Sequence, residues 1–471
     1  MITIDFGNRK NQGLCDYLFE SIKEQILNGT LAANQKLPSK RNLAEHLGIS
    51  VITVQNAYSN LISEGYIYSL ERKGFFVTDL ILQTKNKADE GVIEPSKEVS
   101  KKWFTDFTSN STSYEKFPFA LWSHIMRSVL NSGDEKLLVR QNVKGVFELR
   151  LAISQYLREF RNMYVNPEQI VIGAGTEHLY SMIVQIFGIN NIFVVENPGF
   201  RKVQKIFELS GARCCAVNLD EQGINLCEVE KACGNILHIS PSHHFPTGKV
   251  TQIRRRQELL EWTGKGENRY IIEDDYDSEF RFIGKPLPTL QSADTNQRVI
   301  YINTFSKTLA PSFRISYMVL PQKLLSSVDN NLKIFSCPVS AFEQYTLARF
   351  ISEGHYAKHI IKMKNFYRSL RNNLIQKIKN SEIGKDCIIQ EEDSGLHFLL
   401  TLSESIDPIL FKKELENENV NISLLSDFYY SDVPSFAQKT FVVNYSGIQN
   451  SQIAETVQKM EKAKQKAQIY R

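Results

Sequence analysis

The sequence predicts an α/β protein in two parts: a small N-terminal winged helix-turn-helix and a large body built on a mostly parallel β-sheet. Within residues 1–79, short helical patterns are followed by a strand pair, whereas residues 103–471 alternate apolar strand-like runs with helix-like stretches. The polar, charged segment 80–102 has too few apolar residues to order itself and is expected to be a flexible linker. We therefore expect domains at 1–79 and 103–471, joined by 80–102.

The composition is typical of a globular protein. Of 471 residues, 42% are hydrophobic and 23% are charged, which is enough apolar material for a large core. The formal net charge is only +4, so bulk charge does not indicate nucleic-acid binding. The seven cysteines are scattered without metal-ligand spacing, which favours a reducing compartment. No segment resembles a signal peptide or the ~18-residue apolar run of a membrane span. We expect a cytoplasmic protein with no membrane partner and no metal site.

The N-terminal pattern predicts a helix-turn-helix followed by a hairpin. Apolar residues recur every four positions over 14–27, which predicts a first helix with one buried stripe. Ser39 is suited to cap a second short helix, Gly48 to make a tight turn, and Ser50 to cap a third helix. Two short helices joined by such a turn have helix-turn-helix spacing. The tip 71–74 lies between two short apolar runs, which predicts a hairpin, or wing.

This arrangement predicts a DNA-binding surface. The third helix would enter the major groove with Thr53, Gln55 and Asn56 on its exposed N-terminal half. Gln and Asn can each form paired hydrogen bonds with adenine. The predicted surface is completed by cap, cation and wing residues, several of which would meet phosphates: Ser39, Lys40, Arg41, Arg72, Lys73 and Gly74. Spacing alone leaves an alternative open, namely a small helical dimerisation domain with a solvated charged turn.

Over residues 14–78 the chain resembles the winged helix of the GntR family, on the phrases LPSKRNLAEHLGISVITVQNAYSNLISEGYI and ERKGFFV. The family carries an arginine at the position of Arg41, a threonine at Thr53 and a wing glycine at Gly74. The resemblance implies binding to a double-stranded DNA operator. The chain departs from the family at Val51 and Gln55, where arginines are usual, so the family's usual half-site is not expected to carry over.

In the body, polar residues follow the ends of predicted strands, where open α/β sheets bind ligands. Lys307 lies just past the apolar run 299–303, and a lysine in that setting can form a Schiff base with an aldehyde. Arg314 could hold a phosphate through two hydrogen bonds. The turn 173–176 precedes a predicted helix, whose N-terminus suits the same anion.

An acidic run completes this set. The carboxylate of Asp274 could keep a pyridine nitrogen protonated, and Tyr276 could hydrogen-bond a ring oxygen. Each feature alone is more typical of a surface lysine, a plain turn or a solvated acidic run. Their joint order along the chain is glycine turn, Phe200, acidic pair, Lys307 and Arg314, and it favours a site for pyridoxal 5′-phosphate (PLP).

The body resembles fold-type I aminotransferases, and more closely the MocR-type regulators, in which a GntR winged helix precedes such a body. The phrases VIGAGTEHLY, SPSHHFPTG, IIEDDYDSEFR and NTFSKTLAPSFRISYMVLP carry the resemblance, which covers nearly all of residues 115–400. It implies PLP on Lys307, with Asp274 at the ring nitrogen and Tyr276 at the ring oxygen. It further implies that Phe200 stacks on the ring, and it gives four phosphate contacts: Arg314, Thr304, Gly175 and Thr176. Such bodies build their sites across a two-fold interface, so a homodimer is expected.

One departure bears on function. Aminotransferases hold the substrate carboxylate with an arginine near the C-terminus, and the corresponding stretch 440–447 contains none. The remaining candidates for an effector contact are Arg201, Lys202 and His243. We therefore expect a PLP-dependent transcription regulator that senses PLP or a small amine or amino acid and controls vitamin B6 or amino-acid metabolism. The alternatives are a functional PLP-dependent aminotransferase with a regulatory head, and a DNA-binding protein whose body serves only dimerisation.

Overall fold

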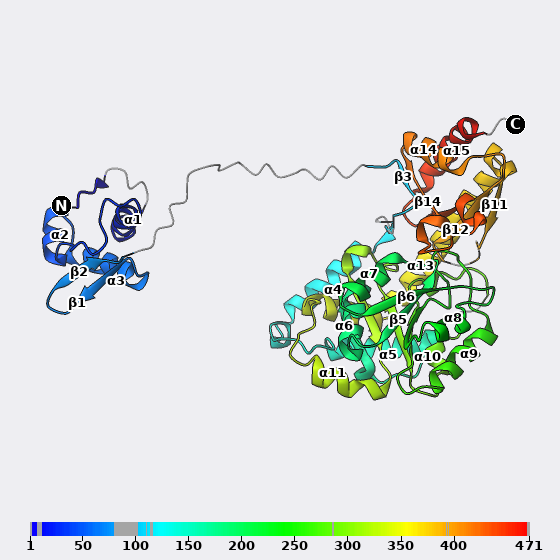
Figure 1. Ribbon diagram of the computed structural model, residues 1–471, viewed down its shortest axis with the longest axis horizontal. Helices are drawn as coiled ribbons and strands as arrows, with labels where there is room; N and C mark the ends of the chain where they lie inside the picture. Colours follow the sequence, from blue (N-terminus) through cyan, green and yellow to red (C-terminus); the bar gives the residue numbers. More distant parts are fainter. Residues whose placement is uncertain are drawn as a thin grey trace. The chain divides into compact units, whose positions relative to one another are not determined.

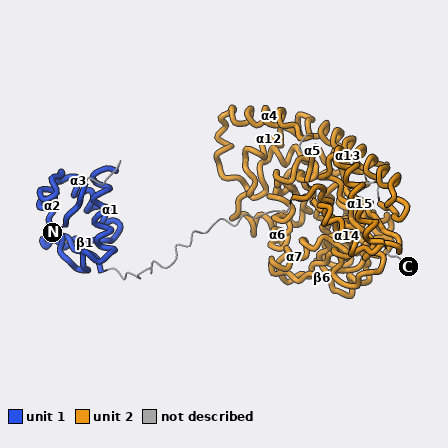
Figure 2. The backbone as a smooth tube through the Cα atoms, turned by 90° about the horizontal axis from the view of Figure 1, so that it is seen from above, with its two compact units in different colours: residues 1–100 blue, residues 101–471 orange. Residues whose placement is uncertain are grey.

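The computed structural model describes residues 2–6, 12–79, 102–109, 111–113, 116–284, 287–391, 393 and 395–468. The chain divides into two compact units, residues 1–100 and 101–471, which we call the head and the body (Figure 2). The predicted linker 80–102 lies outside the described residues except for its last residue, so its flexibility stays a prediction. Every helix in the described part of the chain is too short or too polar to cross a lipid bilayer.

The described residues of the head form three α-helices and a hairpin: α1 Leu14–Leu27, α2 Lys40–Leu47, α3 Val51–Ser63, β1 Ile67–Leu70 and β2 Gly74–Val77 (Figure 1). The side chains of Ser39 and Ser50 accept hydrogen bonds from the backbone at the start of α2 and α3. Between these helices Gly48 has φ 65°, a left-handed conformation that favours glycine. The predicted winged helix-turn-helix is confirmed.

The inner face of α3 holds the head together. Val54, Ala57, Tyr58 and Leu61 are fully buried, as the helical period of 3.6 residues predicts, and they pack against the buried stripe of α1. The hydroxyl of Tyr58 donates a hydrogen bond to the carbonyl oxygen of Pro38 at 3.0 Å, which ties α3 to the segment before α2. The opposite face of α3 is left to solvent.

The body is built on a seven-stranded sheet with the strand order β4-β10-β9-β8-β7-β5-β6. Its strands are β4 Ile170–Ala174, β5 Ile192–Asn197, β6 Arg213–Asn218, β7 Ile236–Ile239, β8 Tyr270–Asp274, β9 Val299–Thr304 and β10 Ile315–Val319. From β6 to β9 all neighbours are parallel, which confirms the mostly parallel sheet. Strand β10 runs antiparallel to both β4 and β9. Strand β6 was not predicted, because this edge strand has no continuous buried apolar run.

Helices cover both faces of this sheet. The body as a whole, including its smaller C-terminal part, contains the helices α4 Phe119–Asn131, α5 Phe147–Arg161, α6 Thr176–Phe187, α7 Arg201–Leu209, α8 Leu226–Lys231, α9 Ile253–Gly264, α10 Leu290–Ala293, α11 Leu325–Asn331, α12 Ala341–Ser352, α13 His355–Lys379, α14 Pro408–Asn417 and α15 Ile453–Ala467. Strand β4 contributes side chains to the cores on both faces of the sheet: Ile170 and Ile172 pack with α5 and α12, whereas Val171 packs with α6 and α7. Alternate side chains of a strand point to opposite faces, so both faces are apolar.

A second, smaller sheet lies towards the C-terminus and has the strand order β11-β12-β15-β14 (Figure 1). Its neighbouring strands are antiparallel: β11 Cys387–Gln390, β12 His397–Leu402, β14 Ser423–Leu424 and β15 Thr440–Asn444. It shares a core with α13, α14 and α15. The short parallel pair of β3 Thr105–Asp106 and β13 Val420–Asn421 joins the start of the body to this part.

Candidate cofactor site and DNA-contacting surface

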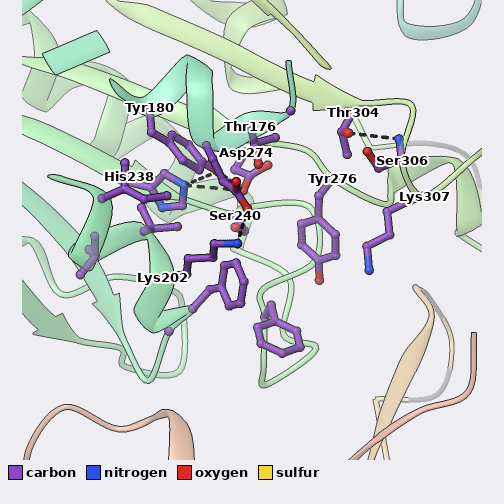
Figure 3. A pocket seen from close by; sticks show the side chains of 18 of the residues that line it. Thr176, Tyr180, Lys202, His238, Ser240, Asp274, Tyr276, Thr304, Ser306 and Lys307 are labelled. Atoms are coloured by element: carbon purple, nitrogen blue, oxygen red, sulfur yellow. Dashed lines mark hydrogen bonds and ion pairs between the residues drawn. The ribbon is translucent and has the colours of Figure 1, made fainter. Parts of the chain in front are cut away.

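A pocket lies at the edge of the large sheet where β4, β8 and β9 end (Figure 3). Asp274 is the last residue of β8, and Lys307 follows β9 by three residues. Because β10 is antiparallel, its first residue pairs with Ala174 at the end of β4, which brings Arg314 to the same edge. The pocket is lined by all eight predicted cofactor residues: Gly175, Thr176, Phe200, Asp274, Tyr276, Thr304, Lys307 and Arg314.

Asp274 is held by two residues from neighbouring elements. Its Oδ2 accepts a hydrogen bond from the hydroxyl of Tyr180 at 2.7 Å and lies 3.6 Å from Nε2 of His238 (Figure 3). Its Oδ1 is buried and has no hydrogen-bond partner. A buried carboxylate oxygen without a donor is costly, so this atom is suited to a proton-bearing group that enters the pocket. The protonated nitrogen of a pyridine ring would satisfy it.

In the view of Figure 3, Tyr276 lies between Lys307 and the group formed by Asp274, Tyr180 and His238. Burial lowers the pKa of Lys307 to about 8, although the carboxylates of Asp277 and Asp274 act in the opposite direction. A lysine with this pKa is partly neutral near pH 7, and the neutral amine is the nucleophile that attacks an aldehyde.

Tyr276 is supported from behind by a buried pair. His243 Nδ1 lies 3.2 Å from the Tyr276 hydroxyl and 2.9 Å from a carboxylate oxygen of Asp277. Burial raises the pKa of Tyr276, so its hydroxyl keeps its proton. The structure therefore places His243, an expected effector residue, beneath Tyr276 and 96% buried, since its exposed fraction is 4%.

The expected phosphate contacts converge at the start of α6. Gly175 has φ 85°, a left-handed conformation that favours glycine, and a Cβ atom there would lie 2.8 Å from a guanidinium nitrogen of Arg314. Helix α6 begins at Thr176, which directs its first backbone N–H groups towards the pocket. Arg314 also forms an ion pair with Glu177, at 2.8 Å. Together these residues can hold an anion.

Thr304 was also expected at the phosphate, and its hydroxyl forms three hydrogen bonds within the protein. The oxygen accepts hydrogen bonds from the Ser316 hydroxyl at 2.8 Å and from the backbone N–H of Ser306 at 3.1 Å. It also donates to the carbonyl of Ile315 at 3.5 Å. Thr304 therefore shapes the loop that carries Lys307, while remaining part of the pocket wall.

The two cations beside Phe200 have different surroundings. Arg201 donates to the carbonyl oxygen of Tyr429, and its guanidinium lies over the ring of Tyr430, 5.7 Å from the centroid. Lys202 lines the pocket and forms an ion pair with Glu177. Among the expected effector residues, Lys202 is thus the one that lines this pocket.

The residues of the pocket that the sequence analysis did not assign to it include Tyr180, His238 and Ser306. A signal existed for Tyr180, which lies four residues after Thr176 and so on the same helical face. His238 interrupts the apolar strand β7 and is buried, and a lone polar residue in such a strand needs a partner. Ser306 directly precedes Lys307, and no sequence pattern marked its side chain as part of the site.

On the head, the residues expected to contact DNA lie on the exposed half of α3, on α2 and at the hairpin tip. Gln55 and Asn56 are exposed, while the Thr53 hydroxyl lies 2.8 Å from that of Ser50. Lys40 lies over the ring of Phe75, 5.4 Å from the centroid. The other expected residues are exposed except Gly74, which is partly buried: Ser39, Arg41, Arg72, Lys73 and Gly74.

Comparisons with known proteins identify a known family for the head and another for the body. Residues 15–77 match the family "Bacterial regulatory proteins, gntR family", and residues 104–460 match "Aminotransferase class I and II". The body resembles the crystal structure of an archaeal alanine:glyoxylate aminotransferase, with a TM-score of 0.68, 23% identity and coverage of 77% of this chain and 91% of that one. The kynurenine aminotransferase of Pyrococcus horikoshii, solved with PMP, gives a TM-score of 0.65 at 22% identity over 81% of this chain and 95% of that one.

Three relatives named as regulators match most of this chain and most of their own length. YdeL of Bacillus subtilis, named as an HTH-type transcriptional regulator, is 35% identical over 96% of each chain. The protein named MocR from Rhizobium meliloti is 28% identical over 95% of this chain and 92% of its own. The pyridoxine biosynthesis transcriptional regulator PdxR of Corynebacterium glutamicum is 26% identical over 88% of each. The chain therefore belongs to the MocR-type HTH transcriptional regulators, in which a GntR-family DNA-binding domain precedes an aminotransferase class I and II domain.

Proposed function

We propose that this regulator binds operator DNA through its head and changes its DNA affinity when its body holds PLP. The observation that carries the proposal is the composition of one pocket. A lysine with a lowered pKa, a buried carboxylate with an unsatisfied oxygen, and an arginine beside a helix N-terminus line it together. A protein that binds operator DNA would act in the cytoplasm.

Bound PLP would supply a reactive aldehyde and an electron-withdrawing ring. Lys307 would provide the amine that holds it, and Asp274 would keep a proton at the ring nitrogen. Tyr276, held by His243, would donate a hydrogen bond to the ring oxygen. Phe200, whose exposed fraction is 47%, would cover one face of the ring. Arg314 and the start of α6 would take the phosphate.

The pocket supports a sensor of PLP better than an enzyme acting on an amino acid. Strand β15, Thr440–Asn444, contains no arginine, and Arg201 is occupied by the Tyr429 carbonyl. Lys202 remains, but an ammonium group cannot bind a carboxylate through two parallel hydrogen bonds as a guanidinium does. PLP needs no such contact. The name of the relative PdxR, which refers to pyridoxine biosynthesis, supports vitamin B6 genes as targets.

Two alternatives use the same pocket. A small amine or amino acid could be the effector in addition to bound PLP, and Lys202 would then lie near the carboxylate of an amino acid. A functional aminotransferase remains the competing activity, since Lys307 and Asp274 suit amino-group transfer equally well. In either case the protein would respond to one amino acid more than to PLP alone.

The decisive experiment measures operator affinity for the PLP-free and PLP-loaded protein, with and without a panel of amino acids. The loaded protein should absorb near ~420 nm and be fixed by borohydride, and Lys307→Ala should lose both properties. A ligand shifts a conformational equilibrium only through different affinities for the two states, so PLP must change the dissociation constant for DNA. Equal DNA affinity with and without PLP, together with a large shift on adding one amino acid, would contradict the PLP-sensor proposal.

We further propose a homodimer that binds paired half-sites. The body exposes large apolar side chains, with exposed fractions of 64% for Phe119, 84% for Leu138 and 75% for Ile334. Exposed apolar side chains are often covered at subunit interfaces, so a second copy of the body is expected to cover these. Light scattering at micromolar concentration should give twice the chain mass, and a monomer there would contradict the proposal.

A further inference from the structure

We infer that α3 reads A·T base pairs, and that Ile52, assisted by Val51, does so by contacting the 5-methyl group of thymine. The inference rests on the proposal that the head binds operator DNA, and it names the chemistry of the sequence that is recognised. It concerns the first two turns of α3, where apolar and amide side chains are exposed together.

The first observation is that Ile52 and Val51 have no role in the head's own core. Their exposed fractions are 72% and 43%, whereas Val54, Tyr58 and Leu61 of the same helix are fully buried. β-branched residues are also among the weaker helix formers, so local stability does not favour them in the exposed first turn. An apolar pair in water at this place is explained by a partner that covers it.

The second observation is the absence of charge on the helix. From Val51 to Ser63, α3 contains no charged residue. Guanine is most often recognised through Arg or Lys, which can donate to both of its major-groove acceptors. A helix without either residue is poorly equipped to select G·C pairs. Cations of the head lie on other elements, among them Arg41 on α2 and Arg72 and Lys73 at the hairpin tip, where they suit phosphates.

The exposed side chains that remain match the two bases of one pair type. Gln55 and Asn56 can each donate to and accept from adenine, and an aliphatic group fits the methyl group of thymine. Gln55 and Asn56 lie three and four residues after Ile52, so all three project from one face of α3. Amide and methyl contacts can thus fall on neighbouring A·T pairs in the major groove.

The experiment begins with the full-length protein and a pool of random DNA duplexes, from which bound sequences are selected. The half-site is expected to contain adjacent A·T pairs. In the selected duplex, each thymine is then replaced by deoxyuridine, which removes only the methyl group and leaves pairing intact. At one or two positions this should weaken binding about fourfold, as expected when one methyl group is no longer buried.

Protein variants then assign the contact. Ile52→Ala should bind the thymine and deoxyuridine duplexes equally, whereas the control Ile62→Ala, at the far end of α3 and 38% exposed, should keep the preference. The deoxyuridine comparison uses the unaltered protein and is therefore independent of how a variant folds. A half-site specified by G·C pairs, or equal affinity for every deoxyuridine duplex, would overturn the inference and leave DNA binding intact. Failure to bind any duplex would overturn the proposed function itself.

Discussion

The pH at which PLP attaches is a direct test of the pocket. Burial lowers the pKa of Lys307 to about 8 from the ordinary value of 10.5. Only the neutral amine attacks an aldehyde, so the attachment rate should rise with pH and level off once the amine is neutral. A pKa of about 8 places this plateau just above pH 8, whereas an unperturbed lysine would give a rate that rises to beyond pH 10.

The size of the effect follows from the two pKa values. At pH 7 about one Lys307 amine in ten is neutral, against about one in three thousand for an ordinary lysine, so attachment should be roughly 300-fold faster. Asp277 is the strongest of the charges that raise the pKa of Lys307. Asp277→Asn should therefore lower this pKa further and move the plateau to lower pH.

Stopped-flow absorbance after mixing PLP with the PLP-free protein, between pH 6 and pH 10, gives the rate. Nα-acetyllysine in the same buffers serves as the control, because it corrects for ionisation of PLP itself. If the corrected rate still increases tenfold per pH unit above pH 9, Lys307 is not desolvated and the reasoning is wrong. A plateau that moves to higher pH in Asp277→Asn would refute the assigned electrostatics.

Three further predictions concern single contacts. Glu177→Gln should lower the dissociation constant of PLP by roughly three- to tenfold in an equilibrium titration, because it removes a carboxylate that competes with the phosphate for Arg314. The control Glu208→Gln, at an exposed position, should leave this dissociation constant unchanged. Arg41→Ala should weaken DNA binding across all sequences and reduce its salt dependence, whereas Gln55→Ala should cost about 1–3 kcal/mol only at the preferred base; unchanged affinity for all duplexes with Gln55→Ala would show that α3 is not the reading helix. Tyr58→Phe should destabilise the head by about 1 kcal/mol in thermal unfolding, because the carbonyl of Pro38 loses its donor, and an unchanged melting temperature would show that this bond adds nothing.

The features that the sequence determined are those with short-range causes. The head helices follow from apolar periodicity and from caps such as Ser39 and Ser50, each of which acts within three residues. The strands of the large sheet follow from continuous apolar runs, and the position of Lys307 just after one of them is local as well. The family resemblance added the roles of residues that local patterns alone could not assign.

The features that only the tertiary structure decided depend on contacts between distant segments. Arg314 meets Gly175 because β10 runs antiparallel beside β4, and strand direction is set by pairing across the sheet. Tyr180 and His238 reach Asp274 from two other elements, and no spacing in the sequence records that meeting. The hydrogen bonds of Thr304 to Ser316 and of His243 to Asp277 likewise depend on how distant segments pack. The ligand contacts expected for Thr304 and His243 stay predictions. Local periodicity specifies which residues are buried, but the partner of each buried polar group depends on how the elements pack.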